Sequence, residues 1–488
     1  MNYKMVLNTL GKAMTIGALL LVFPLVVGAY YGENCYFAFL TPMLALAAVG
    51  VPLSFIKTED KAIYAKEGFV IVASSWIILS VAGALPFIIT GVIPRFTDAF
   101  FETVSGFTTT GASVLDGAGV DGLYASHKGL MFWRMFTHWI GGMGVLVFLL
   151  ALLPSTGGSM HLYRAESPGP SASKFVSKMR RTAVILYAIY FGMTVLCFIM
   201  LLFGGMGVYD SVLNAFSIAG TGGLNLHGAG VAYYNSAYVE IVMAVFMFLF
   251  ALNFNFYYLI LTGEFVKAFK CEEVRVFFLI VLFSTFAIAL NILNACGNFA
   301  TALRYAFFQV TSISSTTGFS SVNFNEWPSL SKAILLVLTV IGACGGSTGG
   351  GLKVSRMLVL CKSGYSDVKK MVHPRAVLTV RLEGEAVGEG VQRNVRSFFI
   401  LWVIIVIACT LILSIDPFSG GDVLTDFTAT LACIGNVGPG LNLVGPAECY
   451  AGYSALSKTV LSVVMLAGRL EIFPLVIMLS PRTWKKAH

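Results

Sequence analysis

Charged residues are scarce in this chain of 488 residues: Asp, Glu, Lys and Arg make up 11% of it, and 57% of the residues are hydrophobic. Soluble domains carry about 25% charged residues, so this scarcity excludes a soluble globular protein. The mean hydropathy of +0.82 instead indicates an integral membrane protein. The net charge of +8 does not indicate a nucleic-acid partner, because the basic residues lie in alternate connections between apolar runs, as in cytoplasmic loops.

Sequence signatures of metal centres, nucleotide sites and catalytic sites are also missing. The nine cysteines are an odd number without a CxxC pair and lie mostly in apolar runs, which argues against a disulfide or metal framework. The glycine-rich stretch before Lys353 does not fit G-x-x-x-x-G-K-[ST], since Val354 follows the lysine. No Cys/His/carboxylate cluster or Ser/His/Asp set stands out. We therefore expect neither an enzyme nor a cofactor bound by this chain.

Ten apolar runs are long enough to span a membrane, which takes about 20 residues. They lie near 13–32, 36–56, 68–94, 135–160, 183–208, 241–262, 276–298, 333–352, 398–415 and 459–480. Basic residues cluster in every second connection, from Lys4 before the first run to Lys486 after the last. By the positive-inside rule we expect both termini on the cytoplasmic side.

Four stretches between apolar runs share one pattern, a helix-compatible segment of about a dozen residues that ends in small polar residues and glycine. They read TDAFFETVSGFTTTGAS from Thr97, YDSVLNAFSIAGTGGLN from Tyr209, RYAFFQVTSISSTTGFS from Arg304 and TDFTATLACIGNVGPGLN from Thr425. The pattern indicates a fourfold repeat of long helix, short helix, polar loop and second long helix. A helix of about ten residues reaches only about half of the hydrocarbon core, so each loop must re-enter from the same side.

Irregular backbone at membrane depth is tolerated where protein buries it or where it lines a water-filled path. Four such loops predict a pore, and rings of backbone carbonyls suit a cation. Glycine permits the positive φ that inward-pointing carbonyls need, and the short helices direct their negative ends toward the centre. The residues leave open whether the loops are only packing elements, whether the ion is K⁺ or Na⁺, and whether transport is coupled to Na⁺ or H⁺.

The run VLTVIGACGGSTGGGLKV, from Val337 to Val354, interrupts an otherwise good membrane helix with glycines. Each helix-interior glycine costs about 1 kcal/mol relative to alanine, so we expect a broken, mobile segment here. The last apolar run contains Arg469 and Glu471. Charged residues within a membrane span are energetically costly, so both are candidates for a functional role. Two residues apart on one helix, they should point to nearly opposite faces. We expect Glu471 to be structural, and Arg469 to be functional, a clamp between repeats, or both.

Seven stretches carry a family resemblance. They are TDAFFETVSGFTTTGAS, HWIGGMGVLVFLLALLP, LYRAESPGP, GGSTGGGLKV, HPRAVLTVRLEG, NVGPGLN and GRLEIFPLVIMLSPRTW. The chain resembles the Trk/Ktr/HKT superfamily of potassium transporters, specifically the bacterial TrkH type. The resemblance implies an all-α polytopic membrane protein with four pseudo-symmetric helix/pore-helix/helix repeats around one pore. Two extra N-terminal helices would bring it to ten transmembrane helices and four re-entrant pore loops.

Carried over by position, the resemblance assigns the K⁺ selectivity filter to four residues in each loop. These are Thr108, Thr109, Thr110 and Gly111; Ala219, Gly220, Thr221 and Gly222; Ser315, Thr316, Thr317 and Gly318; and Gly435, Asn436, Val437 and Gly438. Glycine rather than serine at position 111 implies K⁺ rather than Na⁺. The second loop departs from the family pattern at Leu224 and Asn225.

In the family, the glycine-rich segment is an intramembrane gate that blocks permeation together with the arginine. The gate residues implied are Gly345, Gly346, Ser347, Thr348, Gly349, Gly350, Gly351 and Arg469. The resemblance also implies a homodimer with one pore in each subunit, in the bacterial cytoplasmic (inner) membrane. A cytoplasmic TrkA-like ring, which itself binds the regulatory nucleotide, would dock on the basic stretch 361–397, although lipid headgroups of the bilayer also explain those charges.

The repeats predict a division of the chain into five parts. These are an N-terminal two-helix domain at 1–66 and pore repeats at 67–164, 165–270, 271–385 and 386–488, with the glycine-rich loop 345–351 in the third repeat.

Overall fold

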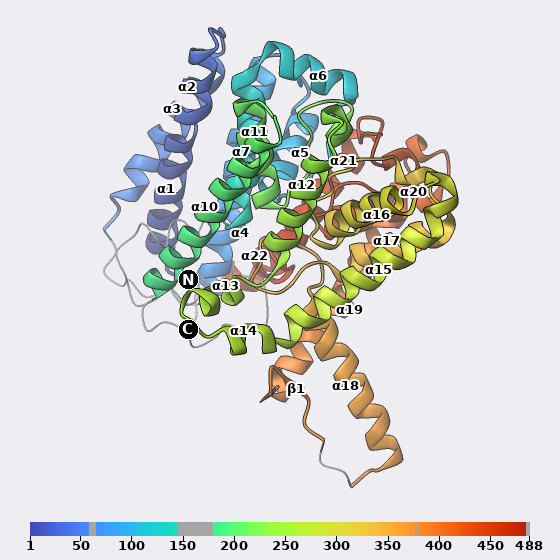
Figure 1. Cartoon of the computed structure of the whole chain (residues 1–488). Helices are drawn as coiled ribbons and strands as arrows, with labels where there is room; N and C mark the ends of the chain where they lie inside the picture. The colour runs from blue at the N-terminus through green and yellow to red at the C-terminus, as the bar shows by residue number, and fades with distance from the viewer. Residues whose placement is uncertain (58–64, 145–178, 376–377, 485–488) are drawn as a thin grey trace.

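The computed structural model describes residues 1–57, 65–144, 179–375 and 378–484, whose regular secondary structure is almost entirely helical (Figure 1). The helices before residue 145 are α1 (Tyr3–Leu20), α2 (Val22–Tyr30), α3 (Tyr36–Ser54), α4 (Ala65–Ile89), α5 (Phe96–Phe107), α6 (Gly117–Ser126) and α7 (Lys128–Gly142). The predicted boundary between the first two repeats, at 164/165, and most of the apolar run 135–160 lie outside the described residues.

The rest of the described chain repeats the same kinds of element. Its α-helices are α10 (Met179–Phe203), α11 (Val208–Gly220), α12 (Ala237–Ala251), α13 (Phe254–Leu261), α14 (Phe265–Lys270), α15 (Glu272–Cys296), α16 (Phe299–Ser314), α17 (Ser329–Ile341), α18 (Val354–Val372), α19 (Glu389–Leu413), α20 (Val423–Ile434), α21 (Ala455–Arg469), α22 (Phe473–Leu479) and α23 (Pro481–Trp484). Short 3-10 turns are η1 (Gly230–Tyr234), η2 (Phe324–Glu326), η3 (Pro417–Ser419) and η4 (Asn442–Val444).

Six described helices are long and apolar enough to cross a membrane, with α1 and α2 counted as one over Tyr3–Tyr30. The number is eight if each of two bent pairs also counts as one span. These eight overlap eight of the ten predicted runs. Within the part of the chain that the structure describes, the other two runs, 135–160 and 333–352, contain the shorter helices α7 and α17. The outward faces of the long helices carry large exposed hydrophobic side chains, such as Phe37, Phe283 and Leu411. Such apolar faces are typical of contact with lipid, so the fold is that of an α-helical, multi-pass membrane protein.

Two of the predicted continuous runs are in fact broken. The run 241–262 bends by 90° between α12 and α13, and the run 459–480 bends by 119° between α21 and α22. At the second break, Glu471 and Ile472 adopt φ values of +60° and +63°, which no α-helix can contain. The expectation that Arg469 and Glu471 share one helix is therefore wrong, because α21 ends at Arg469.

A small β-hairpin also departs from the all-helical expectation. Strands β1 (Arg381–Leu382) and β2 (Glu385–Ala386) pair antiparallel, with Arg381 opposite Ala386. The turn residues Glu383 and Gly384 have φ values of +54° and +80°, the left-handed pair that a two-residue hairpin loop requires. The hairpin and α18 extend away from the helical body (Figure 1).

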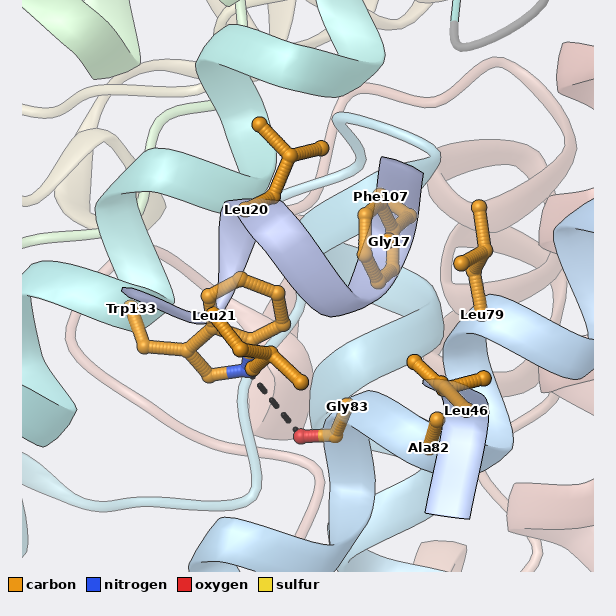
Figure 2. Close-up of a pocket in the computed structure, with 9 residues that line it drawn as sticks. All are labelled: Gly17, Leu20, Leu21, Leu46, Leu79, Ala82, Gly83, Phe107 and Trp133. Atoms are coloured by element: carbon orange, nitrogen blue, oxygen red, sulfur yellow. Dashed lines mark hydrogen bonds between the residues drawn. The ribbon is translucent and has the colours of Figure 1, made fainter. Parts of the chain in front are cut away.

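The N-terminal helices α1 and α3 pack on each other and on α4. Figure 2 shows the small apolar crevice at this junction, with residues of α1, α3, α4, α5 and α7 on its walls. Its lining consists of Gly17, Leu20, Leu21, Leu46, Leu79, Ala82, Gly83, Phe107 and Trp133. The Trp133 indole nitrogen donates to the Gly83 carbonyl at 3.1 Å. Phe107 is the last residue of α5, so the N-terminal helices stabilise the base of the first polar loop from outside.

Candidate functional site

The four short helices α5, α11, α16 and α20 end in the same backbone conformation. The residue one or two positions after each helix has a left-handed φ between +53° and +60°, and a glycine two residues later has a φ between +73° and +93°. The first set is Thr109, Thr221, Thr316 and Asn436, and the second is Gly111, Gly223, Gly318 and Gly438. We call the segments that contain them loops 1 to 4, residues 108–111, 220–223, 315–318 and 435–438.

The hydrogen bonds of the loops follow the same alignment. In each loop, the amide after the left-handed residue donates to a carbonyl five residues back. These bonds are Thr110 to Ser105 at 2.9 Å, Gly222 to Ser217 at 2.8 Å, Thr317 to Ser312 at 2.9 Å and Val437 to Ala432 at 2.8 Å. Gly222 therefore matches Thr110, and Gly223 matches Gly111.

The predicted alignment of loop 2 is thus wrong by one residue. The sequence prediction began the second quartet at Ala219, which lies inside α11, and ended it at Gly222. Two consecutive glycines, Gly222 and Gly223, satisfy the same sequence pattern. Only the backbone conformation separates them, because Gly223 alone has the positive φ.

The key glycines connect the four loops into a closed ring. A Cβ atom added at any of them would collide with a carbonyl oxygen of the next loop. From the added Cβ to the carbonyl oxygen, the distance would be 2.1 Å for Gly111 and Gly222, 1.8 Å for Gly223 and Thr317, 1.9 Å for Gly318 and Val437, and 2.6 Å for Gly438 and Thr110. The carbonyl partners are the four equivalent residues of the alignment, so loop 1 meets loop 2, loop 2 meets loop 3, loop 3 meets loop 4, and loop 4 returns to loop 1.

The left-handed residues of the ring are strained. Thr109, Thr221 and Thr316 are β-branched, and such residues are genuine outliers at positive φ. Backbone strain of this kind costs about 1–3 kcal/mol per residue and occurs mainly at functional sites. All three threonines and Asn436 are at most 1% exposed. Repetition of one strained conformation in four buried loops therefore indicates a shared function.

Side chains stabilise loops 1 and 3 in one way and loop 4 in another. Hydroxyl pairs at 2.7 Å join Thr108 to Thr110 and Ser315 to Thr317. The matching positions in loop 2 are glycines, and in loop 4 they are Gly435 and Val437. Loop 4 instead uses the Asn436 amide, which donates to the Thr110 hydroxyl at 2.9 Å and to the Met465 carbonyl at 3.0 Å.

Side chains of the helices around the ring contact the loops on the side that faces away from its centre. The Arg134 guanidinium and the Glu102 carboxylate form an ion pair at 2.7 Å, and Glu102 also accepts from the Val114 amide at 2.9 Å beyond loop 1. His138 is fully buried, with Nδ1 at 3.1 Å from the Ser217 hydroxyl and its ring against Gly222. These side chains fix the ring and lie outside it.

The glycine-rich segment lies between α17 and α18, and the helix ends at Ile341 as the glycine content predicts. Its residues Gly349 and Gly350 are buried against loops 3 and 4. The Gly350 amide donates to the Thr316 hydroxyl at 2.6 Å. A Cβ at Gly349 would lie 2.7 Å from the Ser315 carbonyl oxygen, and one at Gly350 would lie 2.5 Å from that of Gly435. The segment therefore lies directly beneath half of the ring.

Arg469 connects this segment to the other half. Its guanidinium donates to the Thr348 carbonyl at 2.8 Å and to the carbonyls of Gly141 and Gly142 at 2.6 and 2.7 Å. Those two glycines pack against the Phe107 carbonyl before loop 1 and against Gly220 of loop 2. The arginine is thus a carbonyl clamp between repeats, and the glycine-rich segment with Arg469 extends beneath all four loops.

Glu471 has a separate structural partner. Its carboxylate forms an ion pair with Arg356 of α18 at 2.5 Å, and the Arg356 guanidinium lies 4.3 Å above the Phe398 ring. This pair ties the break after α21 to the helix that follows the glycine-rich segment.

Sequence reasoning missed two charged residues beside the glycine-rich segment. Glu273, in the first turn of α15, is 3% exposed and accepts from the Gly345 and Ser355 amides at 2.6 and 3.0 Å. Lys353 is 2% exposed, has a φ of +75°, and donates to the Gly349 carbonyl. In the sequence, Glu273 is marked only as an acidic residue at the start of an apolar run, and Lys353 only as the lysine that follows the glycine-rich stretch.

The structure brings together the predicted residues of loops 1, 3 and 4, the glycine-rich segment and Arg469, together with Gly220, Thr221 and Gly222 of loop 2. Among the described residues, no group of three or more His, Cys, Asp or Glu side chains is arranged to hold a metal ion. The oxygen atoms gathered at the ring belong to main-chain carbonyls, to the hydroxyls of the loop threonines and Ser315, and to the side-chain amide of Asn436.

Comparison with known proteins gives a consistent result over the whole chain. Residues 37–486 match the TrkH family, described as cation transport protein. The Trk system potassium uptake protein TrkH of Salmonella typhimurium is 34% identical, with 100% of both chains covered. The corresponding protein of Vibrio parahaemolyticus is 35% identical over 99% of this chain and 100% of its own length. The crystal structure of the potassium transporter TrkH from Vibrio parahaemolyticus matches with a TM-score of 0.87 and 32% identity, over 99% of this chain and 100% of that chain.

Proposed function

The chain belongs to the TrkH family of cation transport proteins, and on this premise we propose that it takes up potassium ions across the bacterial cytoplasmic membrane. The printed names of its relatives, Trk system potassium uptake proteins, support K⁺ as the transported ion. Membership of a transport family confirms the expectation that the chain is not an enzyme.

In this proposal K⁺ passes through the ring of loops 1 to 4, and the closed set of glycine-to-carbonyl contacts is the observation that carries it. Four equivalent carbonyls, of Thr110, Gly222, Thr317 and Val437, meet the neighbouring loops in a cycle. Rings of carbonyl oxygens replace the water ligands of a dehydrated cation. Each short helix also directs about half a negative charge at its C-terminal end toward the ring. The filter residues are then 108–111, 220–223, 315–318 and 435–438.

The glycine-rich segment 345–351 and Arg469 act as the gate of this path. The contacts of Thr348 and Gly350 beneath the ring support this role. A guanidinium next to the path repels a cation, and a segment with five glycines among its seven residues can change its backbone conformation at low cost. Opening then requires Arg469 to leave its three carbonyl partners.

In this proposal the protein has one defined orientation in the membrane and a defined set of partners. Both termini face the cytoplasm, the protein spans the bilayer ten times in the five parts predicted above, and all four loops re-enter from the outer side. The protein works as a homodimer with one pore in each subunit. A cytoplasmic TrkA-like ring docks on 361–397 and controls the gate by binding nucleotide, whereas this chain binds only the transported K⁺. The name Trk system in its relatives supports an association with other Trk components.

The test is a measurement of reversal potential in a planar bilayer. Purified protein, with its regulatory partner present, is placed in a K⁺ gradient while Na⁺ and pH are varied independently. We expect the potential to follow the K⁺ gradient alone. A potential displaced in fixed stoichiometry by Na⁺ or pH would overturn the passive path and favour a coupled secondary transporter.

A further inference from the structure

One carboxylate oxygen holds both ends of the glycine-rich segment. Oε1 of Glu273 accepts from the Gly345 amide at 2.6 Å, at the start of the segment, and from the Ser355 amide at 3.0 Å, in the first turn of α18. These amides come from positions 72 and 82 residues further along the chain. Glu273 is buried, so neither amide could readily exchange this partner for water.

The same residue is held from the opposite side by the β-hairpin. The carboxylate of Glu383 accepts from the Glu272 amide at 2.9 Å and from the Glu273 amide at 3.1 Å, which are the first two amides of α15. Cys271, at the N-cap position, supplies no side-chain cap of its own. A distant carboxylate thus satisfies donors that the local sequence leaves open, in the position where the helix dipole favours negative charge.

The thiol of Cys271 also donates to Glu383, at 3.2 Å. Burial, and to a lesser degree the carboxylate of Glu383, raises the pKa of this thiol to about 12, so it stays protonated and remains a donor. The Lys362 ammonium group on α18 bonds both the Glu272 carboxylate and the Arg381 carbonyl of the hairpin. The hairpin is therefore anchored to the start of α15 by several polar contacts.

We propose that Glu383 and Glu273 form a link through which the hairpin 381–386 controls the glycine-rich segment. Glu273 is its central residue: its amide bonds the hairpin, and its carboxylate bonds the segment. The hairpin lies within the stretch 361–397, and Glu383 is exposed to a binding partner. Movement of the hairpin would withdraw the cap from α15, shift Glu273, and release the segment at Gly345 and Ser355. This inference rests on the proposed gating role of that segment.

The test combines two measurements on the full-length protein in liposomes without a partner. The first is passive K⁺ flux, and the second is hydrogen–deuterium exchange of the amides from Gly345 to Ser355. The variants are Glu383→Ala, Glu273→Ala and the double variant. Glu385→Ala is the matched control, because Glu385 is an exposed carboxylate on the same hairpin, two residues away. Glu273→Gln, which keeps an acceptor oxygen, guards against a loss of folding.

We expect Glu273→Ala to raise basal flux about tenfold and Glu383→Ala to raise it about threefold, because each leaves amides without a charged acceptor. The double variant should match Glu273→Ala, since both act on one link. Exchange from Gly345 to Ser355 should quicken in Glu383→Ala, while exchange in loop 1 stays constant. Glu273→Gln should lie between wild type and Glu273→Ala.

The link is overturned if Glu383→Ala behaves like Glu385→Ala in exchange, or if the two single effects multiply in the double variant. A failure of the proposed function gives a different result. Wild type and all variants would then carry no K⁺-selective flux, whereas the exchange measurement would still report whether the hairpin holds the segment.

Discussion

The four loops of the ring and the glycine-rich segment beneath them are both buried, irregular and rich in glycine, yet they are held in opposite ways. Each loop closes on its own helix through a backbone bond five residues back and meets its neighbours through equivalent carbonyls. The glycine-rich segment is held by side chains from other parts of the chain, namely Glu273, Thr316 and Arg469, and by a backbone bond from the Phe254 amide to the Gly346 carbonyl at 3.0 Å.

This difference separates a fixed element from a movable one. Backbone bonds within a loop cannot be lost without unfolding the loop. Each key glycine also lies so close to a carbonyl of the next loop that a larger residue does not fit. A side-chain hydrogen bond contributes about 0.5–1.5 kcal/mol net, or about 1.5–3 kcal/mol when one partner is charged, and it can be exchanged for another. The same residue type, glycine, therefore serves close packing in the ring and backbone freedom in the segment.

The largest effect should come from breaking the ring at Gly223. In Gly223→Ala, the residue must keep a φ of +73° and its Cβ would lie 1.8 Å from the Thr317 carbonyl oxygen. The left-handed backbone alone costs about 1–2 kcal/mol, and the clash with main chain has no relief. We expect K⁺ uptake to fall to background in a potassium-limited growth assay, with protein levels checked by fluorescence-detected chromatography.

Gly222→Ala tests the corrected alignment against the predicted one. Its added Cβ would meet the ring of His138, 2.0 Å from Nδ1, and no positive φ is required. The double variant Gly222→Ala/His138→Ala removes that obstacle, so it should recover part of the uptake. His138→Ala should not rescue Gly223→Ala. The alignment derived from the backbone would be contradicted if His138→Ala rescued Gly223→Ala, or if it failed to rescue Gly222→Ala.

Replacement of Arg469 should have the next largest effect, in the opposite direction. For an ion about 4 Å away at an effective dielectric constant of about 20, a unit charge repels a cation by about 4 kcal/mol. We therefore expect Arg469→Gln to raise basal K⁺ flux in liposomes at least about tenfold. Arg469→Lys keeps the charge and loses the planar fork. Flux in Arg469→Lys close to wild type would assign the block to charge, and flux close to Arg469→Gln would assign it to the clamp on Thr348 and Gly141.

A smaller effect is expected at Thr316, where ring and segment meet. Thr316→Val keeps the branched shape and deletes the oxygen that accepts from the Gly350 amide at 2.6 Å. Loss of one neutral hydrogen bond, about 1 kcal/mol, should raise basal flux roughly fivefold while the K⁺/Na⁺ ratio stays constant. Thr316→Ser retains the oxygen and serves as the control. An altered K⁺/Na⁺ ratio in Thr316→Val would show that the Thr316 hydroxyl also shapes the filter and does not serve only the contact beneath it.

The sequence allowed prediction of what depends on composition and local pattern. Apolar runs identified most of the long helices, and clusters of glycine and small polar residues identified the four loops. It could not separate Gly222 from Gly223, since their difference is a backbone angle. The break after Ala251 was also hidden, because Leu252 and Asn253 interrupt an apolar run without glycine or proline. The contacts of Glu273 join residues more than 70 positions apart, and no local pattern encodes such a distance.

The smallest predicted effect lies within the ring and compares two equivalent threonines. Thr110 pairs with the Thr108 hydroxyl and also accepts from the Asn436 amide of loop 4, whereas Thr317 pairs with Ser315 of its own loop. Thr110→Ala should therefore lower the melting temperature in detergent more than Thr317→Ala does, by an amount equivalent to about 1 kcal/mol. In the background Asn436→Ala the difference should disappear, because the bond between loops is already lost. If Thr110→Ala and Thr317→Ala lower the melting temperature by the same amount in both backgrounds, carbonyl packing and not the Asn436 amide holds loop 4 to loop 1.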